Sequence, residues 1–151
     1  MNYTLEVHEV FTTAQSAKLS FEYIVDFSLI SEWDHTILKS EKVGSEPIKL
    51  GTQFELLYAR AEQKIPISYE ITEFVPPQKA VLTGSNEIFI PIDTITVEEL
   101  EKGCRINWHA KVEFIGLEAP FDAVTENNIK ESMLETLSGL KSTLDAQVNQ
   151  A

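Results

Sequence analysis

Residues 103–114 read GCRINWHAKVEF, and residues 120–148 read PFDAVTENNIKESMLETLSGLKSTLDAQV. In the first stretch apolar residues alternate with polar ones from Cys104 to Phe114, which predicts a β-strand with one buried face. In the second, apolar residues recur every three to five positions, which predicts one helix of about 28 residues, or about 42 Å. Pro120 suits its first turn. Because such a helix gains most of its stability from tertiary packing, we expect it to lie against a sheet.

The chain between Ile37 and Phe114 supplies that sheet. Runs with strand alternation are separated by turn residues, and we expect six strands in this part of the sequence. Short connections between successive strands predict an antiparallel meander. The breaks fall at residues 43–47, 50–51, 62–63, 76–78, 84–86 and 101–103.

The N-terminal part adds one strand and two short helices. Residues from about 3 to 11 alternate as a strand, and Thr12 and Thr13 are candidate N-caps for a helix through Ile24. Residues 28–33 suit a second helix. With no internal repeat or linker, residues 1–151 are expected to form a single domain. The predicted fold class is α+β, a curved antiparallel sheet (β-α-α-β6-α order) wrapped around a long C-terminal helix.

The composition limits the partners of the protein. A net charge of −12 repels phosphate backbones, so we expect no nucleic acid partner. The simplest explanation of this negative charge is that it keeps the protein soluble. No apolar run approaches the ~20 residues of a membrane span, which predicts no stable membrane insertion. The N-terminus lacks the pattern of a signal peptide, and there is a single cysteine, Cys104, so we expect a cytoplasmic protein. The oligomeric state stays open, a homodimer included.

Hairpin geometry indicates which side chains share a face. A two-residue turn at Glu62-Gln63 predicts the pairs Arg60–Ile65, Tyr58–Ile67, Leu56–Tyr69 and Phe54–Ile71, each on one face. If Leu100 lies opposite Arg105, the last hairpin has the pairs Val97–Trp108, Ile95–Ala110 and Asp93–Val112. The inward face is then apolar, as in an ordinary core, with five polar exceptions: Tyr58, Arg60, Tyr69, Asp93 and Trp108.

These polar groups need partners if they are buried. They either pair with one another or line a cavity between the sheet and the C-terminal helix. We expect such a pocket, with Trp33 or His35 near its mouth and Arg60 placed to meet a ligand carboxylate or phenolate at the rim. The position of Asp93 depends on the hairpin register, and a bulge at Pro91 would turn it outward. The candidate ligand-binding residues are Trp33, Phe54, Leu56, Tyr58, Arg60, Ile67, Tyr69, Asp93, Ile95 and Trp108.

Six short motifs mark a family resemblance that covers almost the whole chain. They are YIVDF at 23–27, EWD at 32–34, LGTQF at 50–54, YEITEFVPP at 69–77, GCRINW at 103–108 and LSGLK at 137–141. In these motifs and in its order of elements the sequence resembles the helix-grip fold of the Bet v 1/START superfamily (SRPBCC), in its polyketide cyclase/dehydrase and lipid-transport branch. Proteins of this kind bind sterols, lipids, polyketides, plant hormones or quinones, and some are cyclases. The superfamily has no universal catalytic motif, so the resemblance implies a pocket and no catalytic residue.

The sequence lacks the motifs of several common catalytic chemistries: Gly-x-Ser-x-Gly, Gly-x-Gly-x-x-Gly, a Walker loop and His-Glu-x-x-His. Three scattered histidines and one cysteine offer little to a zinc ion, so we expect no metal and no cofactor. His8 and His109 fall on polar strand faces, which leaves His35 as the histidine to test as a general base. Glu98 and Glu99 point to opposite faces beside a turn and make a poor acid–base pair.

The leading hypothesis is binding of an apolar or aromatic small molecule, such as a lipid or a polyketide-like compound, in the cavity. One alternative is a polyketide cyclase or dehydratase in which Tyr58, Tyr69, Arg60 or Asp93 moves protons or polarises a carbonyl. Another is a protein-interaction or chaperone-cofactor module whose cavity is incidental. The sequence leaves open whether the protein is an enzyme.

Overall fold

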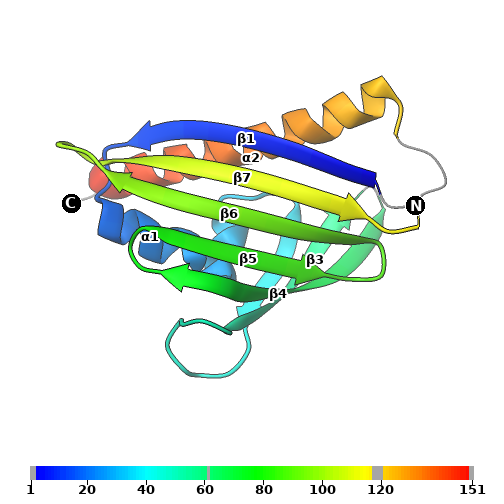
Figure 1. Ribbon diagram of the computed structural model, residues 1–151, viewed down its shortest axis with the longest axis horizontal. Coiled ribbons are helices and arrows are strands. Elements are labelled where there is room, and N and C mark those ends of the chain that lie inside the picture. Colours follow the sequence, from blue (N-terminus) through cyan, green and yellow to red (C-terminus); the bar gives the residue numbers. More distant parts are fainter. Residues whose placement is uncertain (1–2, 61, 117–120, 150–151) are drawn as a thin grey trace.

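Figure 1 shows a curved sheet with helices behind it, in a computed structural model that describes residues 3–60, 62–116 and 121–149. The elements are β1 (Tyr3–Thr13), α1 (Ala17–Val25), the 3₁₀ helix η1 (Phe27–Glu32), β2 (Ile37–Lys42), β3 (Gln53–Arg60), β4 (Gln63–Val75), β5 (Lys79–Ser85), β6 (Phe89–Glu99), β7 (Cys104–Phe114) and α2 (Ala123–Asn149). This is the predicted order of strands and helices, which is confirmed.

The seven strands form one antiparallel sheet in the order β1-β7-β6-β5-β4-β3-β2. Strands β2 to β7 make the expected meander. The first strand of the chain lies beside the last, with a continuous register from Tyr3↔Phe114 to Thr13↔Cys104. This pairing brings the N-terminal strand next to the segment that leads into α2.

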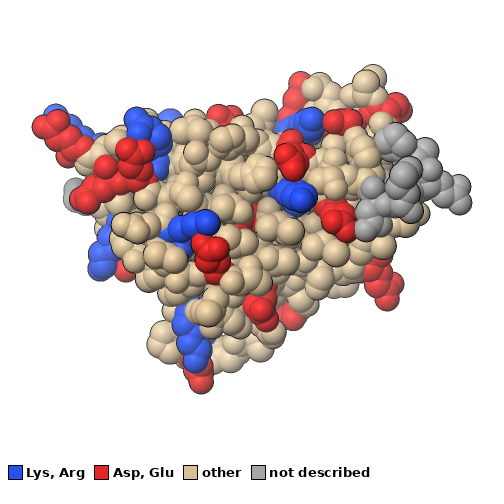
Figure 2. Space-filling view, viewed as in Figure 1, with Lys and Arg blue, Asp and Glu red and all other residues tan. Residues whose placement is uncertain are grey.

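Strand alternation separates a buried face from a solvated one. In β7 the residues Cys104, Ile106, Trp108, Ala110 and Phe114 are buried, which is the face predicted from the sequence. Charged side chains of both signs are scattered over the outer face of the sheet (Figure 2). The hydrophobic core therefore lies on the inner face of the sheet, and a cavity between the sheet and the helices would lie on the same side.

The predicted register of the β3–β4 hairpin is wrong by two residues. Tyr58 pairs with Ile65 rather than with Ile67, because Arg60 already pairs with Gln63 and the connection covers positions 61–62. A shift of two residues preserves every side-chain direction, since the strand period is two. The predicted face therefore survives although the predicted partners do not.

The β6–β7 hairpin shows the same error. Asp93 pairs with Ala110 rather than with Val112, because four residues connect the strands and the Leu100 backbone N–H donates to the carbonyl of Gly103. The register between β6 and β7 is continuous, and the bulge considered at Pro91 is not found in this described pairing. Asp93 therefore stays on the inner face.

Two predicted helix starts also differ from the structure. Ser16, not Thr12 or Thr13, caps α1, because both threonines still belong to β1; the Ser16 hydroxyl accepts from the Leu19 backbone N–H at 3.2 Å. Helix α2 begins at Ala123, where a carboxylate accepts from a backbone N–H in the first turn (Asp122 Oδ1 to Thr125 N, 2.7 Å). Pro120 lies outside the described residues. None of the described helices has both the length and the apolar composition to span a bilayer.

The two halves of α2 have different surroundings. Its buried side chains, Leu137, Leu140 and Leu144, all lie in the C-terminal half. There the Lys141 ammonium also donates to the carbonyl of Thr12 at 2.7 Å, which ties the helix to the end of β1. The N-terminal half contains Val124, which is 71% exposed. One end of the helix is thus anchored in the core, and the other end extends over the sheet.

We expect Leu140→Ala to lower the free energy of unfolding by about 2–5 kcal/mol, because Leu140 is 0% exposed and its removal leaves a cavity under the anchored half of α2. The matched control is Leu134→Ala in the same helix, where the side chain is 37% exposed and the loss should be about 0.5 kcal/mol. Urea unfolding followed by circular dichroism measures both. Equal losses in the two variants would contradict the packing described for α2.

Candidate ligand-binding pocket

A pocket of about 450 Å³ lies between the inner face of the sheet, the η1 region and the N-terminal half of α2. Small-molecule sites in proteins typically have volumes of roughly 300–1,000 Å³. The pocket is lined by Phe27, Ile30, Trp33, Asp34, Thr36, Ile37, Leu56, Tyr58, Ile67, Tyr69, Phe89, Pro91, Asp93, Trp108, Ala110, Val112, Phe114, Thr125, Asn128, Ile129, Ser132, Met133, Thr136 and Leu137.

A glycine in β5 sets how closely two parts of the sheet wall approach. A Cβ on Gly84 would lie 2.8 Å from Cγ of Pro91, closer than real contacts allow, and at a tight 3.0 Å from Cε1 of Tyr69. The missing side chain lets the Tyr69 ring and the Pro91 ring pack over the β5 backbone. A larger residue here would force a shift at Pro91 and crowd the Tyr69 ring.

Trp33 lines the pocket next to η1; it is 4% exposed and packs edge to face on Trp108 with ring centroids 5.7 Å apart. Its indole N–H has no hydrogen-bond partner among the described residues. The next residue, Asp34, accepts hydrogen bonds from the backbone N–H and hydroxyl of Thr36, which fixes the turn into β2. This end of the pocket is therefore aromatic, with one carboxylate held in a turn.

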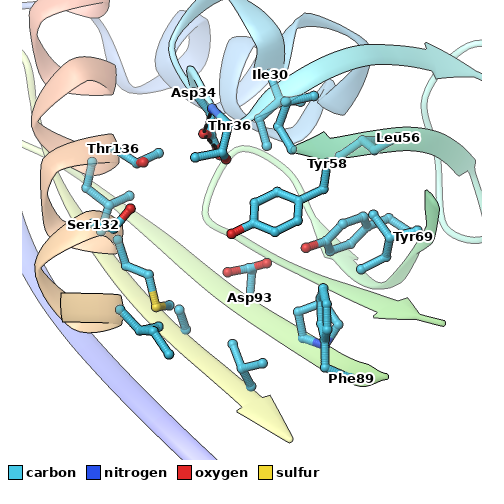
Figure 3. Close-up of a pocket in the computed structure, with 18 of the residues that line it drawn as sticks. Ile30, Asp34, Thr36, Leu56, Tyr58, Tyr69, Phe89, Asp93, Ser132 and Thr136 are labelled. Atoms are coloured by element: carbon cyan, nitrogen blue, oxygen red, sulfur yellow. Dashed lines mark hydrogen bonds between the residues drawn. The ribbon is translucent and has the colours of Figure 1, made fainter. Parts of the chain in front are cut away.

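Three polar groups converge on one part of the pocket (Figure 3). The hydroxyl groups of Tyr58 and Tyr69 point toward the carboxylate of Asp93, while Ser132 and Thr136 project from α2 on the opposite wall. Asp93 accepts a hydrogen bond from the Trp108 indole N–H at 2.9 Å. This carboxylate, which accepts from a neutral indole N–H, lies in a mainly aromatic and aliphatic wall.

This environment changes the acidity of two groups. Burial raises the pKa of Asp93 from 3.8 to about 6; the Trp108 hydrogen bond and His109 lower it, and the charge of Asp34 raises it further. Burial also raises the pKa of Tyr69 well above 10, with the charges of Asp93 and Asp34 acting in the same direction. At neutral pH the pocket therefore combines a neutral tyrosine with a largely ionised Asp93.

The structure brings most of the candidate ligand-binding residues to one cavity. Seven of them line the pocket: Trp33, Leu56, Tyr58, Ile67, Tyr69, Asp93 and Trp108. Phe54 and Ile95 share the inner face but are each 0% exposed and lie in the packed core outside the pocket wall. The side chain of Arg60 lies outside the described part of the chain. A ligand-binding role for these residues stays a prediction.

The histidines lie away from the pocket lining. His35 is exposed, although its neighbours Asp34 and Thr36 line the pocket. His8 is exposed and faces His109 across the β1–β7 pair, on the outer face, as predicted. Among the described residues no group of three or more histidine, cysteine or acidic side chains is arranged to hold a metal ion.

Sequence reasoning missed the polar wall that α2 contributes. Asn128, Ser132 and Thr136 all line the pocket, and they recur at intervals of four residues. Such spacing places them on one helix face, next to the apolar Ile129 and Met133. A polar stripe beside an apolar stripe on one helix face indicates that the helix faces a cavity and not a fully packed core. This pattern could have been recognised in the sequence.

Residues 4–145 match a family model described as polyketide cyclase / dehydrase and lipid transport. The chain belongs to this family. No sequence among the curated proteins matches it. The membership agrees with the helix-grip fold, because the matched region includes every strand and most of α2.

Solved structures of other proteins show the same fold at low sequence identity. Ara h 8.0201 has 14% identity and a TM-score of 0.68, with 94% of this chain and 98% of that chain covered. The protein of unknown function SA2116 from Staphylococcus aureus has 13% identity and a TM-score of 0.73, covering 99% and 98%. The di-domain ARO/CYC StfQ of the steffimycin biosynthetic pathway has 8% identity and a TM-score of 0.72, with 97% of this chain matching 52% of that one. The predicted Bet v 1-like helix-grip architecture is confirmed.

We expect the Asp93 carboxyl group to titrate near pH 6, measured as the ¹³C chemical shift of the side-chain carboxyl signal that disappears in Asp93→Asn. Trp108→Phe should move this midpoint upward, because it removes the donor that lowers the pKa.

The same pKa predicts a pH dependence of stability. The pKa of Asp93 is higher in the folded protein than in the unfolded chain, so the folded state holds this proton more tightly. The difference in unfolding free energy between the unmodified protein and Asp93→Asn should therefore fall as pH rises from about 4 to about 6, and should be constant above that range. A titration midpoint near pH 4 would contradict burial of this carboxylate.

Proposed function

We propose that the protein binds an apolar or aromatic small molecule in the pocket between the sheet and α2. The observation that carries this proposal is the cavity of about 450 Å³ with a mainly aromatic and aliphatic wall and a few convergent polar groups. Burial of apolar ligand surface in such a wall is worth roughly 25 cal/mol per Å², and the polar groups would orient the ligand. The family description, which includes lipid transport, supports the same function.

The proposal treats residues 1–151 as one ligand-binding unit, because the pocket wall takes side chains from the η1 region, the sheet and α2 together. A location in the cytoplasm and a homodimeric state stay predictions. Lipids and polyketide-like compounds are the ligand classes that the family membership favours.

A second candidate function is catalysis of the cyclase or dehydratase type. Asp93 favours it, because a pKa of about 6 suits proton transfer near neutral pH and two tyrosine hydroxyl groups lie on the same side of the pocket. StfQ, which has this fold, is an ARO/CYC protein of a biosynthetic pathway. For an identified substrate, the enzyme hypothesis expects Asp93→Asn to abolish turnover and leave substrate binding intact; unchanged turnover would exclude Asp93 as the proton-transferring group.

The binding proposal is tested by filling the pocket from α2. Ser132→Phe places a ring in the cavity, and we expect it to weaken binding of the neutral fluorescent probe N-phenyl-1-naphthylamine at least about tenfold, since lost contact area and excluded volume act together. Ala110→Phe fills the same pocket from the opposite wall and should do the same. Both are measured by fluorescence titration of folded protein.

The control for this experiment is Leu134→Phe, which adds aromatic surface to α2 at a position outside the pocket lining. It should bind the probe as the unmodified protein does. Equal binding in all four proteins, or no binding in any of them, would overturn the proposed site.

A further inference from the structure

We infer that the pocket selects a lipophilic cation, a protonated amine attached to an apolar or aromatic body, with Asp93 as its counter-ion. This inference rests on the proposed binding function and specifies the chemical class of the ligand. It combines three features of the same cavity: the charge of the lining residues, the aromatic character of the wall and the position of Asp93.

The charged groups that the described lining residues bring to the pocket are two carboxylates. Asp93 comes from β6 and Asp34 from the turn before β2. The remaining polar lining groups are hydroxyl, amide and indole groups, contributed in part by Ser132 and Thr136. An anionic ligand would enter against both carboxylates, in a protein whose net charge is −12. A cationic ligand would be attracted to both carboxylates.

The aromatic wall suits the same charge. Seven lining residues are aromatic: Phe27, Trp33, Tyr58, Tyr69, Phe89, Trp108 and Phe114. The faces of such rings carry negative electrostatic potential and attract ammonium groups, which is the basis of the aromatic cages that bind quaternary ammonium ligands. Their apolar area at the same time accepts a hydrocarbon body.

Asp93 supplies the directed partner. Its carboxylate accepts a hydrogen bond from the Trp108 indole N–H and faces the cavity together with the Tyr58 and Tyr69 hydroxyl groups. A carboxylate can accept several hydrogen bonds, and a buried one is stabilised most by a cation. An ammonium group in this corner would pair with the carboxylate and could donate to the hydroxyl oxygens beside it.

Ionisation of Asp93 then couples binding to pH. Among titratable groups, Asp34 from the turn before β2 and His109 from β7 act on its pKa. The Tyr58 and Tyr69 hydroxyl groups face it from β3 and β4, whereas the described residues of α2 present hydroxyl, amide and apolar groups to the pocket. Because the pKa of Asp93 is raised to about 6, affinity for an amine should increase as pH rises through 6.

The test uses three probes with the same ring system: 2-(2-naphthyl)ethylamine, 2-(2-naphthyl)ethanol and 2-naphthylacetate. Each competes with N-phenyl-1-naphthylamine for the full chain at pH 7.5. We expect the amine to bind at least about tenfold more tightly than the carboxylate, with the alcohol between them. In Asp93→Asn the amine should weaken about tenfold or more, while the alcohol should change less than about threefold.

A pH series on the unmodified protein gives an independent measurement if Asp93→Asn does not fold. Amine affinity should rise about tenfold between pH 5 and 7, and alcohol affinity should stay constant. The inference is overturned if 2-naphthylacetate binds as tightly as the amine, or if the affinity for the amine does not change with pH. If 2-naphthylacetate does bind tightly and Arg60→Gln abolishes that binding, Arg60 is the residue that pairs with the charge of the ligand. If the neutral probe and all three competitors fail to bind, the proposed function fails as well.

Discussion

The unequal packing of α2 is the constraint on which the pocket depends. Leu137, Leu140 and Leu144 fix the C-terminal half of the helix in the core, and Lys141 ties it to β1. The sheet is curved and the long helix continues behind it from this anchor (Figure 1). The pocket lies between the N-terminal half of α2 and the inner face of the sheet. The cavity therefore follows from anchoring a long helix to a curved sheet at one end only. The side chains that face the cavity do not have to pack against the helix, so they can be polar.

That freedom explains the polar content of the inner face. A packed core would make Asp93 and two tyrosine hydroxyl groups costly, because buried polar atoms need partners. In the pocket wall they share a corner with one another and with the Trp108 indole. The same low-polarity surroundings raise the pKa of Asp93 and make it responsive near neutral pH. The proposed ligand selection and the alternative of proton transfer both assign their central role to Asp93, so experiments have to separate binding from catalysis.

The sequence predicted the fold well because its signals are local and repeated. The alternation in β7 and the three-to-five-residue spacing in α2 each extend over many residues. They therefore identify the strand and the helix even where the turns next to them are ambiguous. The β3–β4 register was wrong because a two-residue turn at 61–62 and one at 62–63 look alike in sequence. In both hairpins the error of two residues kept the predicted side chains, Tyr58 and Asp93, on the inner face. The start of α2 at Ala123, just after the capping carboxylate of Asp122, was missed because Pro120 is an equally good local signal.

The candidate site was harder to predict than the fold because a cavity is a property of several elements at once. Face assignment alone could not separate Phe54 and Ile95, which lie in the packed core, from Leu56 and Ile67, which line the pocket. That difference depends on where α2 stops touching the sheet. Hydrophobic patterning reports burial, and it does not distinguish a side chain buried against another side chain from one buried beside an enclosed space.

The most direct test of a ligand site under α2 uses methionine. The chain has two methionines, Met1 and Met133, and Met133 lines the pocket. With ¹³C-methyl methionine, the account predicts that saturating N-phenyl-1-naphthylamine shifts the Met133 methyl signal and gives nuclear Overhauser effects between that methyl group and the naphthyl protons. Tight probe binding that leaves the Met133 signal unshifted and without such effects would contradict a ligand site between the sheet and α2.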